Sequence, residues 1–284
     1  MIVYSLIVEN DSGEWLQMTG NKNYDILSIT GANPPAANIN TSAVVGMDGT
    51  LFNSARANQR NIVLTVAVHY PIESNRFVLY NFFRIKNLVT LKYKTEYREC
   101  FIKGYVESVE VNAWSQSQVA QISIICTQPF WMAENETTVR FSESISLFEF
   151  PFSIPSAGIE FSRRDTLQSL ILNTGEVEVG GVIELHAKAD GVKNPVFYNQ
   201  TTGEYFGVTI TMQNGDSVII NTKYGEKSIT LIRSGFSSNI LNDRKIGSTW
   251  LQFKPGRNLL SFSADEGQSD LEAVLTIRQK YEGV

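Results

Sequence analysis

Apolar and polar side chains alternate one by one along much of this 284-residue chain, and no other feature constrains its fold as strongly. Residues 62–69, 105–111 and 217–221 show the alternation most clearly. Successive side chains of a β-strand point to opposite faces, so a period of two predicts strands with one buried face. The chain is therefore expected to be mostly β.

Turn sequences separate the strand-like runs at short intervals in the second half of the chain. They are Asn173-Thr174-Gly175, Gly180-Gly181, Asn194-Pro195, Thr201-Thr202-Gly203, Asn214-Gly215 and Tyr224-Gly225. Asn-Gly between two β-rich runs is the strongest short hairpin signal, because a type I′ turn needs a positive φ at both central residues. We therefore expect this half to form a β-sandwich of about eight to ten strands.

Residues 74–88 depart from this pattern, since they contain neither glycine nor proline. Ser74 can cap a helix, and one helical stripe collects four apolar residues, Val78, Phe82, Ile85 and Val89. This spacing is typical of an amphipathic helix that lies on a sheet. We expect it to be the one long helix of the protein.

A domain boundary is expected between residues 133 and 158. There an acidic stretch follows Pro129, and an aromatic stretch with Pro151 and Pro155 comes next. Proline interrupts β-ladders, so this segment is interpreted as an extended connector. We expect an N-terminal β domain over residues 1–135, a connector over 136–157 and a C-terminal sandwich over 158–284. One continuous β domain is the alternative.

Charge and composition exclude several classes of partner and location. The chain has 24 Lys and Arg against 29 Asp and Glu, a net charge of −5, and no run of five basic residues. This argues against recognition of nucleic acid or of an anionic membrane. The sequence contains no stretch of about 18 apolar residues, the length needed to span a bilayer. Its N-terminus lacks the basic region of a secretory signal. Cys100 and Cys126 are expected to be buried free thiols.

Residues suited to catalysis or metal binding are few. His69 and His186 are the only histidines, and Glu184 and His186 would share one strand face without a third ligand, so a solvated face is the favoured interpretation. Glu176 and Glu178 could resemble a glycosidase pair, but Glu-Val-Glu is typical of any half-solvated strand. The aromatic residues Tyr198, Tyr205, Phe206 and Trp250 could stack on a sugar, with core packing favoured. We expect no catalytic residue, metal site or cofactor.

Two long stretches carry no charge, and both are candidates for subunit interfaces. They are residues 26–47, which include Asn33, Pro34 and Pro35, and residues 111–133, which include Ser115, Gln116, Ser117 and Gln118. Depletion of charge together with amides and aromatics is typical of the centre of a protein interface. Long uncharged loops are the alternative interpretation.

Several short sequences, in this order and at this spacing, resemble those of the siphophage distal tail protein (Dit) family of phage tail components. In the first half they are MDGTLFNSAR at 47–56, RNIVLT at 60–65, YNFF at 80–83, FIKGYVE at 101–107 and ISIICTQPFW at 122–131. In the last of these, Thr127 and Gln128 replace the usual Pro and Asp. In the second half they are NTG at 173–175, NP at 194–195, GD at 215–216, PGRN at 255–258 and RQKY at 278–281.

This resemblance implies a tail-tube-like N-terminal β-sheet domain with one α-helix and a galectin-like C-terminal β-sandwich of the jelly-roll type. It also implies a structural, non-enzymatic role as a tail-tip or baseplate hub of a siphophage, prophage or tail-like particle. Such a protein would form a hexameric ring that joins the major tail tube protein to a tail-associated lysin or tail fibre and to receptor-binding proteins. It would be located at the tail tip of the virion after assembly in the bacterial host cytoplasm.

A second hypothesis of a different class remains open. The C-terminal sandwich could be a carbohydrate-binding adhesion module that grips a cell-surface carbohydrate without catalysis. A tail-tube subunit would not need a second domain, and a cell-wall enzyme would need a set of catalytic residues that the sequence lacks.

Overall fold

The computed structural model describes residues 4–115, 118–141, 144–146, 162–164 and 168–284. The chain divides into two compact units, Met1–Glu134 together with Lys280–Val284, and Asn135–Gln279. Most of the described residues lie in strands, and α1 is the only α-helix among them. The predicted mostly-β fold with one helix is therefore confirmed, while its galectin-like character stays a prediction.

The first unit is built on an antiparallel sheet with the strand order β2-β1-β7-β8-β9-β6-β3. Its strands are β1 Ser5–Asn10, β2 Trp15–Gln17, β3 Tyr24–Thr30, β6 Arg60–Val68, β7 Leu88–Lys94, β8 Glu99–Val111 and β9 Val119–Cys126. In β6 the predicted alternation is present, since Ile62, Leu64 and Val66 are fully buried and the residues between them are not. Two short strands extend the sheet, because β10 (Trp131–Ala133) pairs with β8 and with β25 (Lys280–Tyr281).

The helix was predicted over residues 74–88, but α1 begins at Ile72 and ends at Phe82. Lys86 has a φ of 72°, a left-handed conformation that ends the helical path, and Leu88 already belongs to β7. The buried stripe is Asn75, Leu79 and Phe82. Val78 and Ile85, which the sequence placed on the buried stripe, are exposed.

Two hydrogen bonds explain why the helix buries Asn75 and Leu79 and leaves Val78 exposed. Tyr24 is buried in the sheet, and its hydroxyl donates to the Asn75 carbonyl at 2.9 Å. The Asn75 side-chain amide donates in turn to the His69 carbonyl at 2.9 Å. Because these bonds turn Asn75 toward the sheet, Leu79, one turn later, faces the core and Val78 does not.

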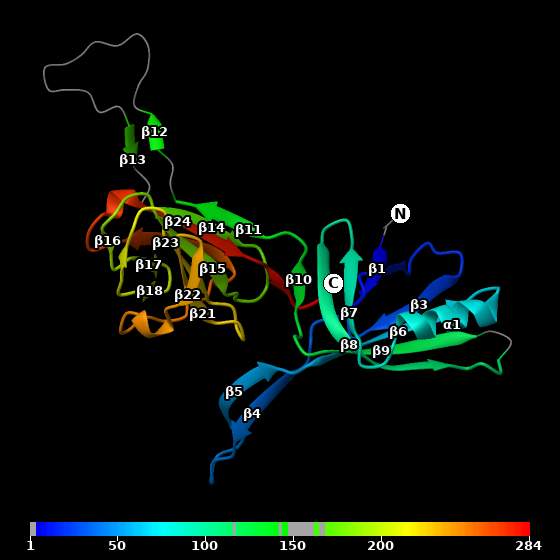
Figure 1. Cartoon of the computed structure of the whole chain (residues 1–284). Coiled ribbons are helices and arrows are strands. Elements are labelled where there is room, and N and C mark those ends of the chain that lie inside the picture. The colour runs from blue at the N-terminus through cyan, green and yellow to red at the C-terminus, as the bar shows by residue number, and fades with distance from the viewer. Residues whose placement is uncertain (1–3, 116–117, 142–143, 147–161, 165–167) are drawn as a thin grey trace, which may run out of the picture. The chain divides into compact units, whose positions relative to one another are not determined.

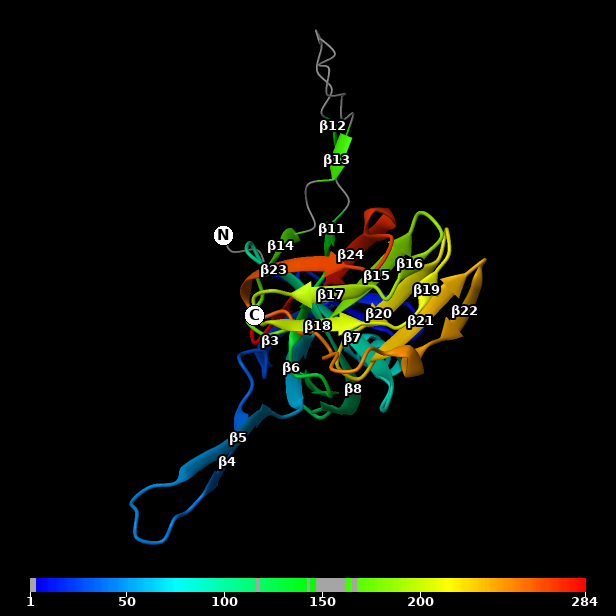
Figure 2. The ribbon, with the colours of Figure 1, turned by 90° about the vertical axis from the view of Figure 1, so that its left-hand side faces the viewer.

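A hairpin of β4 (Ala37–Ser42) and β5 (Leu51–Ala57) forms a separate two-stranded sheet. Figures 1 and 2 show it extending away from the main sheet of the first unit. We call residues 37–57 the arm, and residues 31–36 with 58–60 the arm root. The two strands pair from Ala37 with Ala57 to Ser42 with Leu51, with a register shift after Asn40.

The second unit is a sandwich of two antiparallel sheets with the orders β11-β24-β15-β20-β21-β22 and β14-β23-β17-β18. One core takes residues from both sheets, such as Ile183 and Leu275 from the first and Phe197 and Leu260 from the second. Its strands are β11 Thr137–Arg140, β14 Gln168–Asn173, β15 Gly181–Ala187, β17 Val196–Asn199, β18 Glu204–Gly207, β20 Ser217–Asn221, β21 Ser228–Arg233, β22 Phe236–Asn239, β23 Gly256–Ser263 and β24 Leu271–Ile277.

Shorter elements complete this unit. They are β12 Ser144–Ser146 with β13 Ser162–Arg164, β16 Val192–Lys193 with β19 Thr211–Met212, and the 3-10 helices η1 Leu241–Asp243 and η2 Gln268–Asp270. Asn214-Gly215 forms a turn between β19 and β20, and Gly215 has a φ of 85°. The predicted hairpin is wrong, because β19 pairs with β16, and β20 pairs with β15 and β21.

Part of the predicted connector belongs to the second unit. Residues 137–140 form β11, which pairs with β24, and Phe141 is buried in the sandwich core. Alternation in Thr137–Arg140 is too short to be recognised as a strand, and its stability comes from pairing with a strand more than a hundred residues away. Pro151 and Pro155 of the predicted connector lie outside the described residues.

Candidate assembly surface

The arm exposes large apolar side chains that a lone hairpin has no means to bury. Ile39, Val45, Met47, Leu51 and Phe52 are all more than half exposed, from 52% for Leu51 to 103% for Val45. A two-stranded hairpin is marginally stable by itself in water. Exposed apolar side chains gathered on one element are typical of an interaction surface. The arm is therefore the principal candidate for contacts with another chain.

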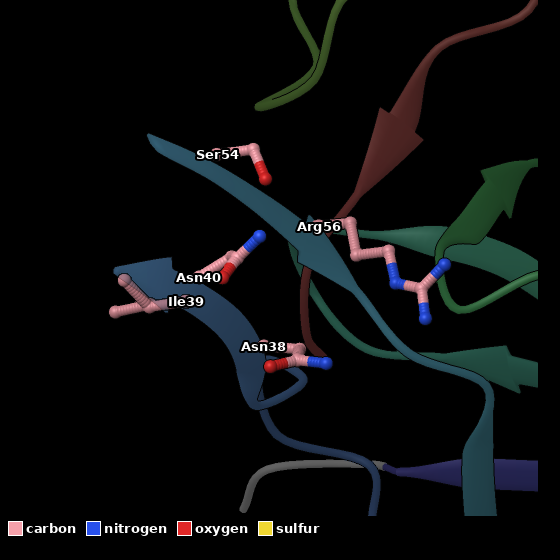
Figure 3. A pocket seen from close by; sticks show the side chains of 5 residues that line it. All are labelled: Asn38, Ile39, Asn40, Ser54 and Arg56. Carbon is pink, nitrogen blue, oxygen red and sulfur yellow. The ribbon is translucent and has the colours of Figure 1, made fainter. Parts of the chain in front are cut away.

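Four polar side chains and Ile39 line a hollow on the paired strands of the arm. Asn38, Ile39 and Asn40 from β4 and Ser54 and Arg56 from β5 line a hollow of about 340 Å³ (Figure 3). The amides, the hydroxyl and the guanidinium offer both hydrogen-bond donors and acceptors. Only Asp48 and Arg56 carry charge in residues 37–57. The hollow thus suits a polar segment of another protein chain better than a highly charged ligand.

The arm root is held by a concentrated set of hydrogen bonds. Gly31 has a φ of 78°, and a Cβ at this position would lie 1.9 Å from the Asn61 carbonyl oxygen, so only glycine fits here. The Arg60 guanidinium is buried and donates through Nη1 to the Gly31 and Ala32 carbonyls at 3.2 and 3.1 Å. Burial lowers the pKa of Arg60, an effect that the nearby Cys126 and Glu282 partly oppose.

The predicted interface residues lie at opposite ends of strand β6. Asn33, Pro34 and Pro35 belong to the arm root, where Asn33 and Pro34 are exposed and Pro35 is half-buried. Ser115 and Gln118 belong to the β8–β9 connection, and both are half-buried. Arg60 at the start of β6 pairs with Cys126, whereas Ala67 near its end pairs with Val119. The two groups are therefore roughly 25 Å apart, given the rise of a strand.

The second group is partly engaged in contacts of its own. The Gln118 amide donates to the Ala113 carbonyl at 2.9 Å, and its oxygen lies 3.4 Å from Nη1 of Arg76 in α1. Gln116 and Ser117 lie outside the described residues. Trp114, in the same uncharged stretch, is fully exposed. No finding tests either group as an interface, so both stay predictions.

A second apolar surface on the first unit was not recognised from the sequence. Phe77 and Val78 on helix α1 and Ile85 after it are 46–60% exposed, and Tyr80 is 36% exposed. Phe77 and Tyr80 form an edge-on pair with centroids 6.1 Å apart, and Arg76 covers the Phe77 ring. Apolar residues occur on both faces of α1, so their spacing does not tell which face is buried. The hydrogen bonds of Asn75 decide this, and they cannot be read from the sequence.

The residues weighed for catalysis are scattered among ordinary contacts. Nδ1 of His186 lies 3.0 Å from the Ser217 hydroxyl, and Lys188 forms an ion pair with Glu272, the residue opposite His186 on β24. His69 contacts Asp25 at 2.8 Å on the surface. Within the described residues no group of three or more His, Cys, Asp or Glu is placed to hold a metal ion. Glu184 is exposed on the outward face of β15, as predicted.

The aromatic residues considered for sugar stacking separate into two pairs. Phe206 is fully buried, and Trp250 packs on it with centroids 4.8 Å apart. Tyr198 and Tyr205 are half-buried neighbours on β17 and β18 with centroids 6.0 Å apart. They point away from the core, because the buried residues Phe197 and Phe206 alternate with them. Of the four, Phe206 is fully buried and the other three are half-buried; the two tyrosines form a pair on the outward face of their sheet, whereas Trp250 packs against the core.

Both cysteines are free and buried, as predicted. Burial raises the pKa of Cys100 and of Cys126 to about 12, with opposing effects of Arg98 and Arg60. Among the helices that the structure describes, none combines the length and the apolar character needed to traverse a bilayer.

Comparisons with known proteins agree with this architecture. Residues 174–281 match the family described as siphovirus-type tail component, C-terminal domain. No curated protein matches the chain. Phage SPP1 Dit, whose structure is described as a paradigm of hub adsorption apparatus in Gram-positive infecting phages, is similar with a TM-score of 0.68 at 12% identity, covering 98% of this chain and 99% of that one.

Two structures of the phage p2 baseplate in its activated conformation are also similar. With Ca the TM-score is 0.55 and with Sr it is 0.53, each at 12% identity and covering 99% of this chain and 100% of that one. The resemblance to the siphophage distal tail protein family is thereby confirmed: residues 174–281 match a siphovirus-type tail component C-terminal domain, and the chain shares its fold with phage SPP1 Dit over nearly its whole length.

Proposed function

We propose that this protein is a structural hub at the distal end of a siphophage, prophage or tail-like particle, without catalytic activity. One observation carries the proposal: nearly all of this chain aligns with nearly all of phage SPP1 Dit, itself described as a hub of an adsorption apparatus. The match to a siphovirus tail component over residues 174–281 supports the same role.

The role requires a closed ring, which we propose to be a hexamer. A ring needs two different surfaces on each subunit, since each copy meets its two neighbours through different faces. The arm and the exposed face around Phe77, Val78 and Ile85 supply two apolar surfaces within one unit. Asn33, Pro34 and Pro35 would join the first contact, and Ser115, Gln116, Ser117 and Gln118 the second. Each contact would bury on the order of 800 Å² per partner.

The ring would join the major tail tube protein on one side to a tail-associated lysin or tail fibre protein on the other, and would carry receptor-binding proteins. The protein would therefore reside at the virion tail tip after assembly in the host cytoplasm. Fully buried thiols are compatible with both places, because a thiol that does not ionise is slow to oxidise.

Oligomeric state tests the proposal directly. Size exclusion with light scattering, followed by negative-stain imaging, should show a ring, alone or with the tail tube protein. The double variant V45D/F52D places charges on the arm and should give monomers. The matched control is Ile246→Asp, which changes an equally exposed residue of the second unit and should leave the ring intact. A wild-type chain that stays monomeric at high concentration with tail tube protein present would contradict the hub.

Binding of a cell-surface carbohydrate is a second candidate function, and one observation favours it. Tyr198 and Tyr205 offer an accessible aromatic pair on the outward face of a sheet, and aromatic faces pack well on sugar rings. Calorimetric titration of the full chain with cell-wall polysaccharide fragments tests it. Binding that Tyr198→Ala abolishes and Tyr224→Ala leaves unchanged would support an adhesive hub. An absence of binding would leave the structural role alone.

A further inference from the structure

Residues 280–284 leave the second unit and become part of the first. β25 pairs with β10, so that Tyr281 lies opposite Trp131 and Lys280 opposite Met132. The residues that follow run along the arm root: Gly283 is buried, and a Cβ on it would lie 2.7 Å from the Pro34 side chain and 2.9 Å from the Pro34 nitrogen. We call residues 280–284 the clasp.

The carbonyl of Ala32, in the arm root, is where the contacts converge. It accepts hydrogen bonds from Arg60 Nη1 at 3.1 Å, from Trp131 Nε1 at 3.2 Å and from the Val284 backbone N–H at 3.3 Å. Nη2 of the same Arg60 donates to the Glu282 carbonyl. The Arg60 guanidinium thus donates hydrogen bonds to both the arm root and the clasp, and the Val284 N–H of the clasp donates to the arm root.

Arg60 is only 4% exposed, and its Nε has no hydrogen-bond partner. A buried guanidinium is costly unless its remaining N–H groups are satisfied. The carbonyls of Gly31, Ala32 and Glu282 are the partners that meet this need. Loss of the clasp would remove one of them and leave Arg60 without a full set, so the arm root and the clasp stabilise each other.

Arg98 holds the clasp from its other side. Its Nη1 donates to the Gly283 carbonyl at 2.6 Å, and its guanidinium lies 4.6 Å from the centroid of the Tyr281 ring. Two arginines therefore bind successive carbonyls of the clasp, those of Glu282 and Gly283. A segment held in this way by charged donors is fixed more firmly than one held by packing alone.

We infer that the clasp fixes the direction of the arm, with Arg60 as the positioning residue between them. The arm has no pairing partner in the main sheet, so its direction depends on residues 31–36 and 58–60. Gly31 makes the turn out of β3, and the clasp with Arg60 blocks movement of that turn. A pre-directed arm loses less conformational entropy when it docks than a freely swinging one.

Distances within one chain test this inference without any need for a ring. Nitroxide labels at T41C on the arm and Q121C on β9 report the direction of the arm by pulsed electron paramagnetic resonance. Both positions are exposed, and the buried native cysteines should not take up label. Labelled chains are diluted with unlabelled chains, so that the distances arise within single copies.

Three variants and one control are compared. Arg60→Met keeps the aliphatic stem but removes every donor, and a chain ending at Tyr281 keeps the β10–β25 pairing but loses the Glu282 and Gly283 carbonyls. Arg60→Lys restores the charge and one or two hydrogen bonds. The control, Asn58→Ala, alters an exposed side chain in the same arm root. Fluorine resonances of 5-fluorotryptophan at Trp131 and Trp250 verify that each unit stays folded.

The wild type and Asn58→Ala should give one narrow distance distribution. Arg60→Met and the shortened chain should broaden it, and Arg60→Lys should recover part of the narrow peak. A narrow distribution in folded Arg60→Met and in the folded shortened chain would overturn the inference. So would equal broadening in Asn58→Ala. A protein that never forms rings would remove the proposed function but would leave these distances just as informative.

Discussion

Replacing Asp216 by Asn should destabilise the second unit by about 2 kcal/mol at neutral pH. The carboxylate is buried and accepts hydrogen bonds from Arg233 Nε at 2.9 and 3.1 Å, from Arg233 Nη2 at 2.6 Å and from the Gln213 backbone N–H at 2.7 Å. A hydrogen bond to a charged group contributes about 1.5–3 kcal/mol. The lower half of this range applies, because the Arg233 side chain is 39% exposed and can be hydrated when its partner is lost.

The effect should depend on pH in a direction that follows from the pKa of Asp216. Burial alone would raise this pKa, but the hydrogen bonds from Arg233 and Gln213 and the charge of Arg233 outweigh burial and lower it below the ordinary 3.8. A carboxyl group whose pKa is lower in the folded than in the unfolded state stabilises the fold at pH values above its unfolded-state pKa. This stabilisation is lost as the pH falls through the lower, folded-state pKa. The difference between wild type and variant should therefore be constant near pH 7 and shrink below about pH 5.

Urea titration followed by fluorine resonances of 5-fluorotryptophan separates the two units. Trp250 reports on the second unit, and Trp131 reports on the first. Glu266→Gln is the matched control, because it breaks the exposed Lys193–Glu266 pair and should change the free energy of unfolding by less than about 1 kcal/mol. A difference between wild type and Asp216→Asn that persists undiminished at pH 3, or one no larger than that of the control, would refute this reasoning.

Three further changes have defined outcomes. Gly104→Ala should lower the free energy of unfolding of the first unit by about 1–3 kcal/mol by overpacking, since its Cβ would lie 2.6 Å from Ile124; an unchanged urea midpoint for Trp131 would contradict this. Phe206→Ala should cost the second unit about 3–5 kcal/mol in the same titration, because the ring is fully buried. Cys100 and Cys126, whose pKa burial raises to about 12, should resist Ellman's reagent at pH 8 until urea unfolds the chain, and rapid labelling of the native protein would count against it.

The period of two predicted the strands well where one face of a sheet is buried and the other is exposed. Strand β6 alternates over its whole length because one face packs in the core of the first unit, which also contains Leu79 and Phe82 of α1, and the other face does not. The turn at Asn214-Gly215 was predicted at the right place, since turn chemistry is local, but it is not a hairpin, because the strands on its two sides belong to different sheets. The helix was placed correctly in the chain but ends earlier than predicted, because Leu88 pairs with Tyr105 in β8 and this pairing overrides the helical pattern.

The candidate site was predictable only in part. Lack of charge pointed to residues 26–47, and the arm and its root lie in that stretch. The hairpin itself gave no signal, because Asn38, Asn40 and Asn53 have low strand propensity. The clasp could not be predicted at all: Trp131 and Tyr281 are paired by topology, and nothing in either local sequence identifies the other.

The pairing of β10 with β25 also imposes an order on biosynthesis. On the ribosome, residues 1–134 emerge first. One strand of their sheet, and the Glu282 and Gly283 carbonyls that accept from Arg60 and Arg98, belong to residues 280–283. At a translation rate of about 5–20 residues per second, residues 135–279 delay completion by roughly seven to thirty seconds. During this interval the arm root of a nascent chain lacks its contacts with the clasp. The first unit can therefore complete its sheet and its arm root only after the whole second unit has been synthesised.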